Sequence, residues 1–157
     1  MRAGIALGSN LGDRHSLLDG AVKSLRLIHE HGPFLVSSFY ETEPHDCPHD
    51  SPSFINAVIE IDTSLEPLML LEHLQALEVG AGRPKVHAFH APRILDLDIL
   101  YYENLFLQTP ELQLPHPKIS ERLFVLQPLA EIRPNLKLPG YKITCLNQLL
   151  FLSSNIS

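Results

Sequence analysis

Apolar residues along the chain follow two spacings, the two-residue period of strands and the three-to-four-residue period of helices. Short apolar runs bounded by glycine or proline predict four strands, at residues 2–7, 34–42, 54–63 and 95–102. Helical spacing predicts two amphipathic helices, at residues 14–30 and 65–77. The order β-α-β-β-α-β is typical of a ferredoxin-like α+β sandwich, an antiparallel sheet with two helices on one face.

Local signals refine these boundaries. Asp13 is a candidate N-cap of the first helix, and Pro67 suits the first turn of the second. After the last strand we expect a short helix over residues 120–129, capped by Ser120, and an irregular tail over residues 136–150. No repeat or linker interrupts the chain, so we expect one domain over residues 1–157 with a C-terminal extension.

Two aspartates interrupt the apolar run of the fourth strand. Asp96 and Asp98 are two residues apart, so strand alternation places both carboxylates on one face, opposite Leu95, Leu97 and Ile99. Aspartate is a poor strand former. Paired carboxylates suit Mg²⁺, which takes few protein ligands and completes its shell with phosphate oxygens and water. A half-exposed strand with an acidic outer face explains the pattern equally well by itself.

Charge and cysteine content limit which ligands and which cell compartment fit the chain. The net charge of −6 disfavours nucleic acid as a partner, so a polyanionic ligand needs a local basic cluster or metal ions. Cys47 and Cys145 form neither a disulfide framework nor a zinc motif, which favours reduced thiols and a cytoplasmic protein. No run of about 18 apolar residues is present, and we therefore expect no membrane span.

Basic residues surround the aspartate pair. They are Arg83, Lys85, Arg93, Lys118 and Arg122. Arginine binds two phosphate oxygens through its planar fork, so this clustering favours Mg²⁺-dependent phosphoryl transfer over isolated surface charges. The glycine-containing loop at residues 8–13 lacks the P-loop and dinucleotide signatures and carries little weight.

Histidine and aromatic residues offer further candidates. The pairs His45/His49 and His87/His90 lack the further ligands that zinc requires, and we interpret them as loop residues. His116 stands between two prolines and is a better candidate for a phosphate or base contact. Phenylalanines beside polar side chains, at residues 54–56 and 122–124, suit a flat heterocycle, although core packing is their commoner role.

Taken together, five ordered blocks resemble the 6-hydroxymethyl-7,8-dihydropterin pyrophosphokinase (HPPK) family of the folate pathway. They lie at residues 8–13, 37–44, 54–58, 78–99 and 114–129, and the segment Pro92-Arg93-Ile94-Leu95-Asp96-Leu97-Asp98-Ile99 is the most specific. The resemblance implies transfer of the β,γ-pyrophosphoryl group of ATP to the pterin hydroxymethyl oxygen, with release of AMP. It also implies two Mg²⁺ ions on Asp96 and Asp98.

The resemblance further implies a set of site residues. Those expected to act in catalysis are Arg83, Arg93, Asp96 and Asp98. Those expected to bind ATP are Gln75, Glu78, Arg83, Lys85, Arg93, Ile99, His116 and Arg122. Those expected to bind the pterin are Thr42, Glu43, Pro44, Phe54, Asn56, Asp96 and Phe124. For partners it leaves open a monomer or a chain joined to, or associated with, another folate-pathway enzyme.

Several positions depart from the family pattern. Lys85 stands where a second arginine is common, which keeps the charge but loses the bidentate fork. His90 replaces a large aromatic residue, and Pro117 follows His116. These departures bear on loop closure and nucleotide affinity rather than on the class of reaction.

Two other functions fit parts of the sequence. A non-catalytic ferredoxin-like binding module would not need Asp96 and Asp98. A nucleotidyl or glycosyl transferase with an Asp-x-Asp pair would bind a nucleotide sugar and have no pterin pocket. Mg²⁺-dependent ATP binding with AMP as the product separates the pyrophosphokinase from both.

Overall fold

The computed structural model describes residues 1–10, 13–42, 53–82 and 95–154. Its main sheet has the strand order β2-β4-β1-β5, β3 also pairs with β4, and every pairing is antiparallel. The strands are β1 (Arg2–Ser9), β2 (Leu35–Val36), β3 (Tyr40–Thr42), β4 (Phe54–Asp62) and β5 (Asp96–Tyr102). The prediction of one strand over residues 34–42 is wrong, because residues 37–39 separate β2 from β3.

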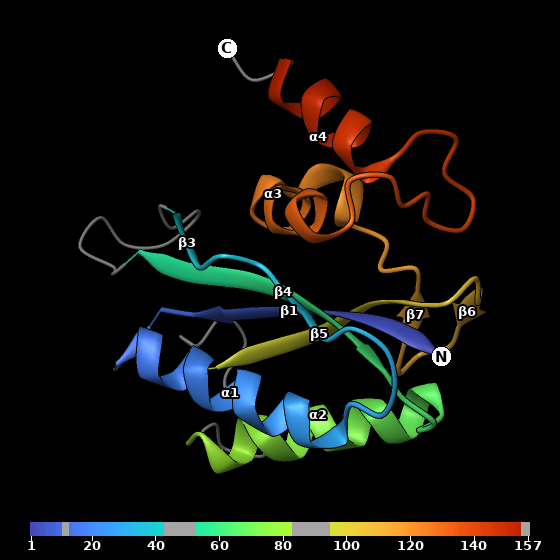
Figure 1. Ribbon diagram of the computed structural model, residues 1–157. Helices are drawn as coiled ribbons and strands as arrows, with labels where there is room; N and C mark the ends of the chain where they lie inside the picture. Colours follow the sequence, from blue (N-terminus) through green and yellow to red (C-terminus); the bar gives the residue numbers. More distant parts are fainter. Residues whose placement is uncertain (11–12, 43–52, 83–94, 155–157) are drawn as a thin grey trace.

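Helices cover both faces of this sheet (Figure 1). One face carries α1 (Arg14–Ile28) and α2 (Pro67–Gly80), which confirms the predicted pair of helices on one face. The other face carries α3 (Leu123–Ile132), with α4 (Cys145–Ser154) packed beyond it. The fold is the predicted α+β sandwich.

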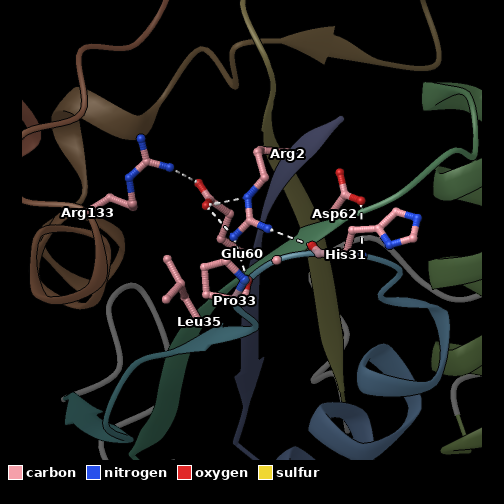
Figure 2. A pocket seen from close by; sticks show the side chains of 8 residues that line it. Arg2, His31, Pro33, Leu35, Glu60, Asp62 and Arg133 are labelled. Atoms are coloured by element: carbon pink, nitrogen blue, oxygen red, sulfur yellow. Dashed lines mark hydrogen bonds and ion pairs between the residues drawn. The ribbon is translucent and has the colours of Figure 1, made fainter.

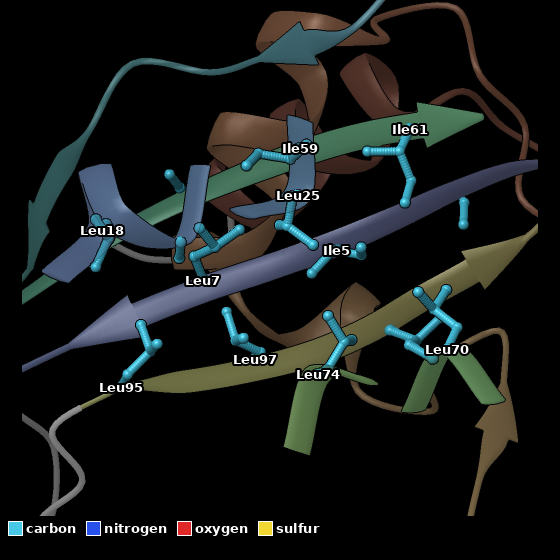
Figure 3. Close-up of a cluster of buried hydrophobic side chains, with 14 of the residues drawn as sticks. Ile5, Leu7, Leu18, Leu25, Ile59, Ile61, Leu70, Leu74, Leu95 and Leu97 are labelled. Atoms are coloured by element: carbon cyan, nitrogen blue, oxygen red, sulfur yellow. The ribbon is translucent and has the colours of Figure 1, made fainter. Parts of the chain in front are cut away.

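Alternation along the strands builds the main core. Apolar side chains of β1, β4 and β5 meet those of α1 and α2 in one cluster (Figure 3), which includes Ile5, Leu18, Ile59, Leu74 and Leu97. Residues 55–61 of β4 are all buried, since both faces of this strand are covered. The core therefore packs the central strands β1, β4 and β5 against α1 and α2.

The helix starts follow the local signals. The Asp13 carboxylate accepts the backbone N–H of Ser16 at 3.2 Å and caps α1 as predicted. Pro67 opens α2, where its missing N–H costs no hydrogen bond. Both helices differ from their predicted bounds by a few residues, which is common at frayed ends.

The C-terminal part corrects two predictions and adds one element that was not predicted. A 3₁₀ turn, η1 (Ile119–Glu121), precedes α3, so Ser120 does not cap a helix over residues 120–129. The expected irregular tail contains α4, whose first turn is capped by the Thr144 hydroxyl, which accepts the Asn147 N–H at 3.2 Å. The hairpin β6 (Leu107–Gln108) and β7 (Gln113–Leu114) was not predicted. Among the described residues, no helix is long and apolar enough to cross a membrane.

Candidate active site

Strand β5 presents the aspartate pair as the sequence predicts. Leu95, Leu97 and Ile99 are buried in the core beneath α1 and α2. Asp96 and Asp98 alternate with them and are half-buried on the face that carries α3. Two carboxylates thus lie on one sheet face, within reach of solvent and of a hard cation.

The register of the sheet aligns this pair with Asn56 on β4. Gly8 of β1 lies opposite Asn56 on one side and opposite Asp96 on the other. Adjacent strands are about 4.8 Å apart, so Asn56 and Asp96 are separated by about 10 Å across the bare backbone of Gly8. A Cβ atom on Gly8 would lie 3.0 Å from the Asn56 side-chain oxygen, and glycine therefore leaves room for that amide.

A hydrogen bond holds the Asn56 side chain in place. Its Nδ2 donates to the Thr42 hydroxyl at 2.8 Å, and the residue is 6% exposed. Thr42 ends β3 and lies opposite Phe54, the first residue of β4. Three predicted pterin-binding residues, Thr42, Phe54 and Asn56, are thus brought together at one corner of the sheet.

The start of α3 supplies an aromatic ring and a cation to the same face. The Arg122 guanidinium lies 5.5 Å from the ring centroid of Phe124, within the range of a cation–π contact. Both residues are half-buried. Alternation places Phe54 on the face that carries α3, so this side of the sheet holds both predicted stacking residues.

A bulge in β5 positions His116. The register shifts between Gly4 and Ile5 of β1, so β5 has one extra residue at Leu100. The Leu100 carbonyl accepts the backbone N–H of His116 at 2.8 Å, which holds the loop after β7 against the strand. The predicted nucleotide contact therefore sits beside the acidic strand.

The ionisation of His116 follows from its surroundings. Burial, then the positive charges of Arg122 and Lys118, lower the pKa of its imidazole, while Asp96 opposes this shift. Its Nδ1 accepts the backbone N–H of Lys118 at 3.1 Å. The neutral ring therefore carries its proton on Nε2 and can donate one hydrogen bond to an anionic ligand.

Three residues expected to contact ATP do not present their side chains on the face that carries Asp96 and Asp98. The buried Glu78 carboxylate accepts the backbone N–H of Leu97 at 2.8 Å, and so supports β5 between the two aspartates. The Ile99 side chain is buried, which confines a contact with ATP to its backbone. Gln75 is exposed on α2. For all three, contact with ATP stays a prediction.

The remaining predicted site residues fall outside the described residues. They are Glu43, Pro44, Arg83, Lys85 and Arg93. Within the described ranges, no group of three or more histidine, cysteine, aspartate or glutamate side chains is arranged to hold a metal ion. A cation at Asp96 and Asp98 would thus take its other ligands from substrate, water or the rest of the chain.

A pocket at the opposite end of β4 has a different character (Figure 2). Arg2, Arg133 and Glu60 line it, and both guanidiniums bind the Glu60 carboxylate. Glu60 is four residues beyond Asn56, or roughly 13 Å along the strand. Because its charges are paired with one another, we do not place the active site there.

Sequence reasoning overlooked one contact near the site. Glu131 of α3 binds the backbone N–H of Ser38 and the hydroxyl of Tyr40, more than 90 residues earlier in the chain. The signal available was weak: Ser38 and Tyr40 lie in the block at residues 37–44, but Glu131 lies two residues beyond the block at residues 114–129.

These features define an α+β domain whose antiparallel sheet carries a two-carboxylate site suited to a metal-bound nucleotide. The family model of 7,8-dihydro-6-hydroxymethylpterin-pyrophosphokinase (HPPK) matches residues 4–134. The chain belongs to the HPPK family, and it is accordingly a pyrophosphokinase of folate biosynthesis with ATP as a substrate.

Individual relatives agree with this family. The chain is 47% identical over 131 residues to 2-amino-4-hydroxy-6-hydroxymethyldihydropteridine pyrophosphokinase of Bacillus subtilis, covering 82% of this chain and 75% of that protein. It is 39% identical over 135 residues to the folic acid synthesis protein fol1 of Schizosaccharomyces pombe, covering 86% of this chain and 18% of that protein.

A solved structure shares the fold. The wild-type HPPK-DHPS of Plasmodium falciparum superimposes with a TM-score of 0.73 at 15% identity, covering 99% of this chain and 41% of that one. The chain thus spans less than half the length of this solved relative.

Proposed function

We propose that Asp96 and Asp98 hold two Mg²⁺ ions, at which ATP transfers its β,γ-pyrophosphoryl group to 6-hydroxymethyl-7,8-dihydropterin. The observation that carries this assignment is the row Asn56–Gly8–Asp96 across three neighbouring strands. It sets an amide that can recognise a heterocycle about 10 Å from the acidic pair, on the same face. This separation suits a bicyclic ring that carries a one-carbon substituent directed at the metal.

The acidic pair fits the proposed ions by its chemistry. Its carboxylates are hard oxygen donors, are half-buried and lie on one strand face, and Mg²⁺ usually binds one or two carboxylates together with phosphates and water. Ions held by Asp96 and Asp98 would supply positive charge to the phosphate oxygens and to the attacking oxygen of the pterin. The new bond joins the hydroxymethyl oxygen to the β-phosphorus, and the bond from the β-phosphorus to the α,β-bridging oxygen breaks. AMP leaves with the bridging oxygen, and the hydroxyl proton passes to water.

The protein side chains orient the two substrates. Asn56 and the Thr42 backbone recognise the pterin edge, while Phe54 and Phe124 stack on its ring. His116 donates its Nε2–H, and Arg122 its guanidinium, to the nucleotide. Gln75, Glu78 and the Ile99 backbone lie on the ATP side, and the proposal also includes Glu43, Pro44, Arg83, Lys85 and Arg93.

The proposal also covers the domain organisation, the compartment and the oligomeric state of the protein. Residues 1–157 form one pyrophosphokinase domain in a cytoplasmic protein, for which the free thiol of Cys145 offers support. We retain both a monomer and a chain joined to, or associated with, another folate-pathway enzyme. The second is supported by the HPPK-DHPS chains among the structural relatives, and sedimentation of the protein alone and with a candidate partner separates the two.

The first experiment measures the product of ATP with Mg²⁺, with and without 6-hydroxymethyl-7,8-dihydropterin. We expect AMP that depends on both the pterin and Mg²⁺, and loss of turnover with EDTA that excess Mg²⁺ restores. ADP as the product, or AMP formation independent of the pterin, would refute the proposed transfer. Turnover unchanged in EDTA would refute the metal assignment alone.

A further inference from the structure

We infer that Glu131 is a positioning residue that sets the register of β3 and thereby the Thr42–Asn56 pair for pterin binding. The inference rests on the proposed pterin site, and it adds a residue that contacts neither substrate. It begins from the way in which β2 and β3 share one edge of β4.

The pairing of these strands contains one extra residue. Val36 lies opposite Ile59, and Tyr40 lies opposite Asn56. Four residue steps on the β2–β3 segment therefore match only three on β4. A one-residue slip in β3 would turn each of its side chains to the other face, so the place of this extra residue decides where Thr42 points.

Hydrogen bonds show that the extra residue is inserted between Ser37 and Tyr40, where Ser38 and Phe39 lie opposite Ala57 alone. Ser37 still follows the β2 register, because its N–H donates to the Val58 carbonyl at 2.9 Å. The Ser37 hydroxyl accepts the Val58 N–H, also at 2.9 Å. Regular pairing resumes at Tyr40, and the exposed Ser38 between the two registers binds a partner outside β4.

Glu131 of α3 is that partner. Its carboxylate oxygens lie 3.0 and 3.1 Å from the Ser38 nitrogen, and one of them also accepts the Ser38 hydroxyl at 3.0 Å. The other accepts the Tyr40 hydroxyl at 2.5 Å. Three donors around the bulge thus share one carboxylate, and charge-assisted bonds of this kind are stronger than neutral ones.

Ionisation of both partners agrees with this geometry. Partial burial would raise the pKa of Glu131, but hydrogen bonds from Tyr40 and Ser38 lower it overall. The hydrogen bond to Glu131, aided by burial, raises the pKa of Tyr40 to about 12. At neutral pH the carboxylate is therefore charged and the phenol keeps its proton, which is the pairing that the contact requires.

The same helix also carries the proposed stacking ring. Phe124 and Glu131 are seven residues apart, or two helical turns, and so lie on one side of α3. One end of α3 thus places Phe124 near the pterin site, while the other fixes the strand that ends in Thr42. Helix α3 holds the two sides of the pterin site in a fixed relation.

The test compares Glu131→Gln with Glu72→Gln, an exposed glutamate on α2. Pterin affinity is measured by calorimetry with Mg²⁺ and a non-hydrolysable ATP analogue, and the KM of each substrate is measured separately. We expect Glu131→Gln to weaken pterin binding about tenfold, equivalent to ~1.4 kcal/mol, with less than a twofold change for ATP. Glu72→Gln should match the parent protein for both substrates.

Two further readouts distinguish positioning from general loss of structure. Spectrophotometric titration should show the pKa of Tyr40 falling towards its ordinary value in Glu131→Gln, with Tyr40→Phe identifying the signal. The effects of Glu131→Gln and Tyr40→Phe on pterin affinity should be less than additive, since both remove the same contact. If Glu131→Gln does not fold, Tyr40→Phe alone decides, with about threefold weaker pterin binding expected.

The outcomes separate this inference from the proposed site. The inference is overturned if folded Glu131→Gln keeps its pterin affinity, or loses pterin and ATP affinity equally, while Asn56→Ala weakens pterin binding. If Asn56→Ala also leaves pterin affinity unchanged, the proposed pterin site is at fault instead.

Discussion

The two ends of one sheet face hold carboxylates in opposite ways. At one end, Glu60 is 1% exposed and accepts bonds from Arg2 and from Arg133, the latter at 2.5 Å (Figure 2). The Tyr101 hydroxyl also donates to Glu60, at 2.5 Å. At the other end, Asp96 and Asp98 are half-buried beside a loop that carries His116.

The difference shows how burial separates a structural carboxylate from one suited to chemistry. A buried charge is tolerated only when partners replace its water, and removing one partner then costs several kcal/mol. A carboxylate that binds a metal must instead keep an accessible oxygen. Acidic residues on one sheet face therefore have different roles according to their exposure, and substitutions at the two ends should separate these roles.

Substitution at the acidic end should remove activity and preserve the fold. Asp98→Ala is expected to lower AMP formation about 1,000-fold, or ~4 kcal/mol in transition-state stabilisation, since it removes a proposed metal ligand from a half-buried position. The thermal midpoint should stay close to that of the parent chain. Asp19→Asn on α1 is the matched control, and near-normal turnover by folded Asp98→Ala would contradict the metal assignment.

Substitution at the Glu60 end should do the reverse. Glu60→Gln is expected to lower the free energy of unfolding by about 3–5 kcal/mol, because Arg2 and Arg133 lose their shared counter-charge. Protein that remains folded should retain most of its turnover. Urea denaturation and activity assays at low temperature test this, with Glu72→Gln as control. A loss of activity without a loss of stability would move Glu60 into the active site.

Two glycine substitutions, one beside Tyr101 and one at an open position on α1, test how packing at the Glu60 end affects stability. A Cβ atom on Gly4 would lie 2.2 Å from Cε1 of Tyr101, whose ring crosses the strand to reach Glu60. Gly4→Ala should therefore destabilise the protein by about 1–3 kcal/mol. Gly20→Ala in α1, with no atom within 4 Å of the added methyl, should instead stabilise it by about 0.5–1 kcal/mol. Effects of the same sign in denaturant titrations would contradict this account.

The smallest expected effect concerns pH at the acidic end. Burial, followed by Arg122 and Lys118, lowers the pKa of His116, so the unfolded chain takes up its proton at a higher pH than the folded one. The free energy of unfolding should therefore fall as pH decreases from about 6.5, the ordinary histidine pKa, towards the lower folded value. His116→Asn should show a shallower decrease in urea titrations, and an equal decrease would contradict the assignment.

Short-range sequence signals determined several structural features of this protein. The placement of Asp96 and Asp98 on one strand face follows from alternation, and the starts of α1 and α2 follow from Asp13 and Pro67. These features depend on neighbours within a few residues, so the sequence alone contains their physical cause. The family resemblance then predicts that Asn56 and Thr42 bind one ligand, which strand patterns alone do not indicate.

Only the tertiary structure decided how distant segments meet. The break between β2 and β3 depends on Glu131, 93 residues beyond Ser38, and Gly4 is required because Tyr101 crosses its strand. Glu60 is buried whereas Asp98 is half-buried, and Arg133 pairs with Glu60 from 73 residues away in the chain. Such contacts depend on register and packing between segments, for which the local order of residues carries no signal.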